Sequence, residues 1–275
     1  MSRLCLLLFS ACVWAGPVDD ARQALTSAAH NKEGDARREA ALALSLVPAK
    51  DPAAALLDQL VKDNDYQVRL AAIDTLGELN DKSRVDLVKS ALKDEVPEVA
   101  FAAAKALYNL KDPVGLQALF AVYEGDTKGR SGYFHKRMRD SWRRLQTPRS
   151  AFLFAVQNGV GFVPMPGVGA GYNALLGVLS DSQFSARAVS LLAVCKTKNG
   201  TCDEMLSTAF DDDDWTVRAA AVHIVTTGNF TAMKPKIVNL IADKKIKVRL
   251  TAAAGYLRMA ANRPVKPSPV RKSKA

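Results

Sequence analysis

Carboxylates are concentrated in one short stretch of the chain. Four consecutive aspartates, Asp211 to Asp214, stand just before Arg218 in "DDDDWTVRAAAV". Carboxylate oxygens are the ligands that hard cations such as Ca²⁺ prefer, so this stretch could hold a metal ion. The alternative is that the aspartates cap a helix and interact with its positive end. A structural role of that kind is expected to recur along the chain.

The pattern does recur within each half of the chain at one constant interval, which is the spacing from Arg38 to Arg69. This interval is typical of short helical repeats. In the first half Arg38 and Arg69 stand one interval apart, although Ala100 stands at the next position and Lys32 precedes Arg38. In the other units an aspartate precedes the arginine position by the spacing that separates Asp63 from Arg69. Apolar residues keep the interval too, at Leu57, Val88, Leu119, Leu175, Leu206 and Ile237. The recurring acidic and basic residues are Asp63, Arg69, Asp94, Asp181, Arg187, Asp212, Arg218, Asp243 and Arg249.

Each unit contains two segments in which apolar residues recur at helical spacing. In the second unit these are the segment with Leu56, Leu57, Leu60 and Val61 and the stretch "DNDYQVRLAAIDTLGEL", which begins with residues typical of an N-cap. Such short helix pairs cannot bury their apolar faces alone, so they stack. The sequence therefore predicts an all-α fold, an α-solenoid of about seven helix-pair repeats with one insertion of about 25 residues between its halves.

The order of an aspartate, five residues, an arginine and "xAAxxxL" resembles the HEAT repeat, in the short form called phycobilisome-lyase-like. The resemblance covers residues 30–125 and 172–262. It implies a ladder in which each aspartate lies near the arginine of its own and of the adjacent repeat. The expected pairs are Asp63 with Arg69, Asp181 with Arg187, Asp212 with Arg218, and Asp243 with Arg249. Asp94 has no arginine in its own unit and its partner stays open.

The fourth unit departs from the pattern and is strongly basic. Residues 126–149 carry eight Lys or Arg against two Asp, a net charge of +6, around an apolar stripe at helical spacing. After Arg149 comes an uncharged stretch rich in glycine, and the insertion is taken as 147–171. The stripe could pack on neighbouring repeats, the region could attach to an anionic membrane surface, or it could bind a partner. The candidate binding surface comprises Lys136, Arg137, Arg139, Trp142, Arg143 and Arg144.

The amino terminus, "MSRLCLLLFSACVWAG", is typical of a secretory signal peptide over residues 1–15. Cys12 also fits a degraded lipobox, so a lipoprotein is the alternative. Export to the periplasm or cell envelope predicts a disulfide between Cys195 and Cys202, which flank a turn-forming Asn-Gly pair. Repeats are expected over 17–125 and 172–262, the divergent region over 126–171, and a disordered basic tail over 263–275.

The sequence favours a binding role over catalysis. His30, His135 and His223 lie in different units without metal-ligand spacing, and no G-x-S-x-G motif occurs. The His-Glu dipeptides through which the related deoxyhypusine hydroxylases bind iron are missing from the sequence. Neither a cofactor nor a metal is therefore expected.

The charge of the chain narrows the class of partner. The formal charge of +10 is concentrated in 126–149 and in the tail, and no nucleic-acid module accompanies it. We predict a scaffold of the cell envelope that binds another protein, and we do not expect nucleic acid as a partner. The alternatives are an adaptor on an anionic membrane surface or envelope polymer, and a bilin-lyase-like enzyme or chaperone.

Overall fold

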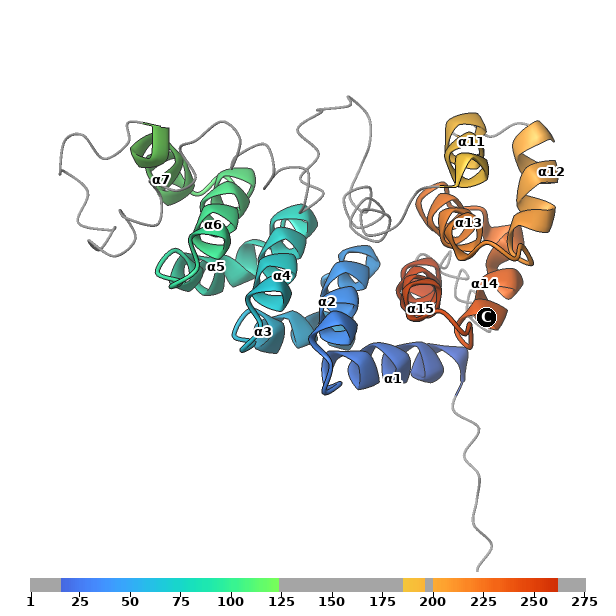
Figure 1. Cartoon of the computed structure of the whole chain (residues 1–275), viewed down its shortest axis with the longest axis horizontal. Helices are drawn as coiled ribbons and strands as arrows, with labels where there is room; N and C mark the ends of the chain where they lie inside the picture. Colours follow the sequence, from blue (N-terminus) through green and yellow to red (C-terminus); the bar gives the residue numbers. More distant parts are fainter. Residues whose placement is uncertain (1–15, 124–184, 196–199, 262–275) are drawn as a thin grey trace, which may run out of the picture.

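The computed structural model describes residues 16–123, 185–195 and 200–261 (Figure 1). All regular elements in these ranges are helices, which confirms the predicted all-α fold. The first half contains α1 (Pro17–Ala29), α2 (Gly34–Ala43), η1 (Leu44–Leu46), η2 (Pro52–Ala55), α3 (Leu56–Leu60), α4 (Tyr66–Leu79), η3 (Lys82–Arg84), α5 (Val85–Ala91), α6 (Pro97–Asn109) and α7 (Pro113–Tyr123). The second half contains α11 (Ala186–Val194), α12 (Gly200–Ala209), α13 (Trp215–Thr227), η4 (Thr231–Met233), α14 (Lys234–Leu240) and α15 (Ile246–Ala261).

Several helices begin at an acidic residue whose side chain caps the first turn. Asp65 accepts a hydrogen bond from the Gln67 backbone N–H and so starts α4. Asp214, the last residue of the aspartate run, accepts one from the Thr216 N–H and starts α13. These bonds satisfy N–H groups that have no partner inside the helix, which is why the helices start there.

The repeating apolar positions form the core. Leu57, Val88, Leu206 and Ile237 are each fully buried, whereas Leu119 on α7 is only partly buried. The second helices of successive units pack closely because small residues line their contacts. A Cβ atom built on Gly77 of α4 would lie 2.9 Å from the Ala106 Cβ of α6, so this contact has no room for a side chain.

The order of the units in space differs from their order in the sequence. Within each half the second helices stack in chain order. In the first half α2 packs against α4 and α4 against α6, and in the second half α11 packs against α13 and α13 against α15. The last helix, α15, then packs against α1 and α2 of the first unit, as Figure 1 shows. The array therefore runs α11, α13, α15, α2, α4, α6 in space, and we call the contact of α15 with α1 and α2 the joint.

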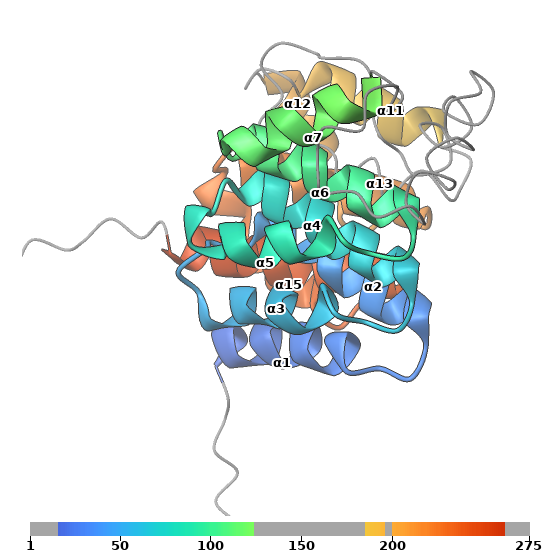
Figure 2. The ribbon, with the colours of Figure 1, turned by 90° about the vertical axis from the view of Figure 1, so that its left-hand side faces the viewer.

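The first helices of the N-terminal units form a second layer. Figure 2 shows α1, α3, α5 and α7 following one another along the stack in front of the second helices. Helix α7 occupies the end of the described array that is farthest from the joint, and α11 and α12 occupy the other end (Figure 1). None of the described helices combines the length and the hydropathy that a membrane span requires.

Candidate functional site

Arginines and aspartates join successive units in a ladder, but the pairs are shifted from those expected. Arg69 of α4 donates from Nε and Nη2 to the two carboxylate oxygens of Asp94, 2.8 and 2.9 Å away. Arg218 of α13 holds Asp243 in the same way at 2.8 and 3.0 Å. Each carboxylate is thus bound by the arginine of the preceding unit. Asp94 consequently has a partner although Ala100 replaces the arginine of its own unit.

The arginine contacts its own unit through backbone carbonyl groups. Arg69 Nη1 donates to the Asp63 carbonyl at 2.9 Å, and Arg218 Nη1 donates to the Asp212 carbonyl at 2.6 Å. Arg249 contacts the Asp243 carbonyl in the same manner at 2.6 Å. The expected side-chain pair of Asp63 with Arg69 is therefore replaced by a carbonyl contact, and the same holds for the other two units.

In the first unit the register is one residue earlier than the interval predicts. Arg37, and not Arg38, pairs with Asp63, with Nε 2.7 Å from one carboxylate oxygen and Nη2 2.8 Å from the other. Its Nη1 donates to the Asn31 carbonyl at 2.9 Å, so Asn31 occupies the aspartate position that the interval assigns to Lys32. The Asn31 side chain accepts from the Glu33 N–H, just as Asp63 accepts from the Asp65 N–H.

Burial and charge determine the protonation of the ladder. Burial by itself raises the pKa of Asp243, but the hydrogen bonds from Arg218 and the Lys245 N–H, with the charges of Arg218 and Lys244, lower it below its usual 3.8. The same balance lowers the pKa of Asp63, with Arg37 in the place of Arg218. Asp63 and Asp243 are therefore ionised and paired at neutral pH.

The rungs differ widely in exposure. The side chains of Arg218 and Asp243 are each only 7% exposed, whereas Arg187, which pairs with Asp212, is 69% exposed. Asp181, which was expected to pair with Arg187, lies outside the described residues. An ion pair shielded from water is expected to affect stability far more than one in solvent.

The aspartate run that suggested a cation site is used for structure. Asp212 forms a rung with Arg187, Asp214 caps α13, and Asp211 lies 3.2 Å from the Lys236 ammonium group. In the described ranges no group of three or more His, Cys, Asp or Glu side chains is placed to hold a metal ion. The ladder and the cap therefore account for Asp212 and Asp214 of this run.

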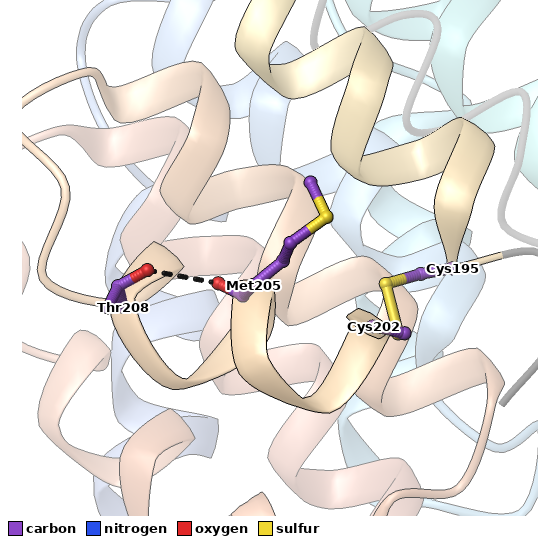
Figure 3. The surroundings of a disulfide bond; sticks show 4 residues. All are labelled: Cys195, Cys202, Met205 and Thr208. Atoms are coloured by element: carbon purple, nitrogen blue, oxygen red, sulfur yellow. Dashed lines mark hydrogen bonds between the residues drawn. A yellow bond between two sulfur atoms is a disulfide. The ribbon is translucent and has the colours of Figure 1, made fainter. Parts of the chain in front are cut away.

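The two cysteines of the second half form a disulfide in the structure (Figure 3). Cys195 follows the end of α11, and Cys202 lies in the first turn of α12, with 5.0 Å between their Cα atoms. Cys202 is fully buried. Beyond it on α12, Thr208 donates its hydroxyl hydrogen to the Met205 carbonyl at 3.2 Å. The disulfide between Cys195 and Cys202 fastens α11 and α12 to each other at one end of the array.

Exposed apolar side chains gather near the other end of the array. Leu116 and Phe120 of α7 are 58% and 56% exposed, and Tyr108 near the end of α6 is 47% exposed. Leu116 and Phe120 are four residues apart, so they share one face of α7. The Lys111 ammonium group lies 5.6 Å from the centre of the Tyr108 ring. We call Tyr108, Leu116 and Phe120 the α7 patch.

Sequence reasoning missed the α7 patch. The interval assigns Leu119 to the core and gives no separate role to the other apolar residues of "VGLQALFAV". Leu116, Leu119 and Phe120 follow the i, i+3, i+4 spacing of one helix face, so the pattern alone assigns all three to the core. The surface that was predicted instead, comprising Lys136, Arg137, Arg139, Trp142, Arg143 and Arg144, lies outside the described residues.

One of three comparisons with known proteins identifies the repeat. The family model for HEAT repeats matches residues 53–130. No curated protein sequence matches the chain. A solved structure of human deoxyhypusine hydroxylase in complex with glycerol is similar, with 14% sequence identity over 89% of this chain and 96% of that chain and a TM-score of 0.31.

Proposed function

Because this chain is a HEAT-repeat protein, we propose that it is a non-catalytic scaffold of the cell envelope that binds another protein through the α7 patch. HEAT repeats mediate protein–protein interaction, since stacked helix pairs present an extended surface to a partner. The α7 patch supports this assignment most directly. The partner we propose is a protein that offers an apolar segment to α7.

The exposure of the patch argues for a binding role. Large side chains that are more than half exposed carry a cost in water, and a helix of a repeat array normally buries such residues against the next unit. Leu116 and Phe120 are both more than half exposed, and Tyr108 of the adjacent helix α6 is 47% exposed with an aromatic ring and a hydroxyl group. Aromatic and aliphatic anchors of this kind contribute most of the binding energy in many interfaces.

The location in the cell envelope rests on separate support. The leader-like amino terminus and the disulfide between Cys195 and Cys202 both fit an oxidising compartment. Trapping free thiols in intact cells with a membrane-permeant alkylating reagent tests this part. The expected result is that both cysteines escape modification until a reductant is added, and rapid modification without reductant would contradict export.

Photo-crosslinking in cells tests the partner. A photoreactive phenylalanine analogue replaces Phe120 in one variant and Tyr66 in a control variant, because Tyr66 is a 42% exposed aromatic residue of α4 outside the patch. We expect a discrete protein adduct from position 120, no equivalent adduct from position 66, and loss of the adduct when Leu116→Asp is added. Equal adducts from both positions, or none from position 120, would refute the role of the patch.

A further inference from the structure

The joint brings together the first and the last of the described helices. Helix α15 (246–261) packs against α1 (17–29) and α2 (34–43), and the same core contains buried residues of all three. Leu25 of α1 is fully buried, and Leu250 and Leu257 of α15 are 1% and 2% exposed. The joint thus has the apolar interior that is typical of a permanent interface.

The electrostatic contacts at the joint differ from those of the ladder. Arg249 belongs to the last described unit, and the unit next to it in space is the first one. There the aspartate position of the ladder is occupied by the neutral Asn31. A different charged pair crosses the joint: the Lys247 ammonium nitrogen of α15 lies 3.6 Å from a carboxylate oxygen of Glu39 on α2. The Glu39 side chain is only 4% exposed, and the Lys247 side chain is 19% exposed.

Neighbouring residues fix the positions of these two charges. Lys247 also lies 5.6 Å from the centre of the Trp215 ring at the start of α13, and Arg38 lies 3.8 Å from the same Glu39 carboxylate. A carboxylate buried this deeply is costly without a cation beside it. The pair therefore favours this one mode of packing between α15 and α2 over alternatives that would separate the two charges.

The two described helices that the covalent connection joins lie away from the joint. Residues 124–184 leave from α7 and enter at α11, and these helices stand at the two ends of the array (Figure 1). The peptide link therefore does not hold α15 against α1 and α2. The register between the halves depends on the non-covalent contacts of the joint.

We infer that residues 16–123 and 185–261 are two complementary halves that recognise each other through the joint, so that the array stays assembled when the chain is cut between them. The contacts of α1, α2 and α15 are thus sufficient to hold the two halves together as separate chains.

Cleavage of the full chain tests this inference. A recognition sequence for a site-specific protease is inserted between Gly167 and Val168, and the folded protein is cut and passed over a size-exclusion column at decreasing concentration. We expect the two fragments to elute together at micromolar concentration with unchanged helical circular dichroism. Elution of separate fragments from the cut wild-type protein would overturn the inference.

A charge-exchange series tests the part played by Lys247 and Glu39. In the cut protein, Lys247→Glu and Glu39→Lys are each expected to raise the dissociation constant of the fragments at least tenfold, and the double exchange is expected to restore part of the affinity, because Arg38 still repels a lysine at position 39. Lys236→Glu is the matched control, because Lys236 pairs with Asp211 inside the second half. If the double exchange dissociates as readily as either single variant, or if the control dissociates equally, the pair does not select the joint.

Discussion

The buried rung between Arg218 and Asp243 offers a sharp test of how the repeats are held together. Arg218 makes two hydrogen bonds to the Asp243 carboxylate and two to the carbonyl groups of Asp212 and Asp213. Replacing Arg218 with alanine leaves a buried carboxylate without its cation. The loss expected for breaking such a pair is about 3–5 kcal/mol in the free energy of unfolding.

Arg187→Ala is the matched control because it removes the same rung one unit earlier. Asp212 is 7% exposed, like Asp243, but Arg187 itself is 69% exposed, so water can replace its guanidinium group, and the expected loss is about 1 kcal/mol. Urea denaturation followed by circular dichroism measures both variants. If the two substitutions cost the same within about 1 kcal/mol, the burial of the rung does not govern its strength.

Three further predictions concern pH, redox state and the joint. Burial and the nearby charge of Arg258 lower the pKa of His223 from 6.5 to about 4, so the unfolded chain binds a proton that the fold excludes. Stability should fall by about 1.4 kcal/mol per pH unit between pH 6.5 and 4, and His223→Gln should flatten this part of the urea-derived profile. Reducing the disulfide of Cys195 and Cys202, or replacing both with serine, should cost about 2–3 kcal/mol in the same assay, and an unchanged midpoint would contradict this. Asn31→Asp should complete a rung with Arg249 and raise the stability by about 1 kcal/mol at most, a gain that Arg249→Ala should abolish.

The sequence was sufficient to predict the repeat but not the order of the repeats. The constant interval identifies Leu57 and Val88 as equivalent core positions because each unit must bury its apolar side against a neighbour, and both are fully buried. That reasoning places each unit beside the next one in the chain. It does not reveal that α15 packs on α1, since this depends on the match between two surfaces from opposite ends of the described sequence.

The ladder shows why equivalent positions alone do not identify partners. The interval located the arginines and aspartates, yet the carboxylate of Asp94 is bound by Arg69 of the preceding unit, because the arginine side chain extends across the contact between units. The first unit is one residue out of register, so that Arg37 takes the place predicted for Arg38. The α7 patch was missed because a fixed interval identifies core residues and does not show which apolar residues lack a cover.

The permuted order of the units has a consequence for biosynthesis. Helix α1 is the first of the described helices to be translated, and its neighbour α15 is the last of them. At about 5–20 residues per second, the apolar side of the newborn first unit waits at least 10 seconds for the segment that covers it. Protection of that early segment by a chaperone or translocation factor during synthesis would prevent aggregation, and final closure becomes a post-translational event.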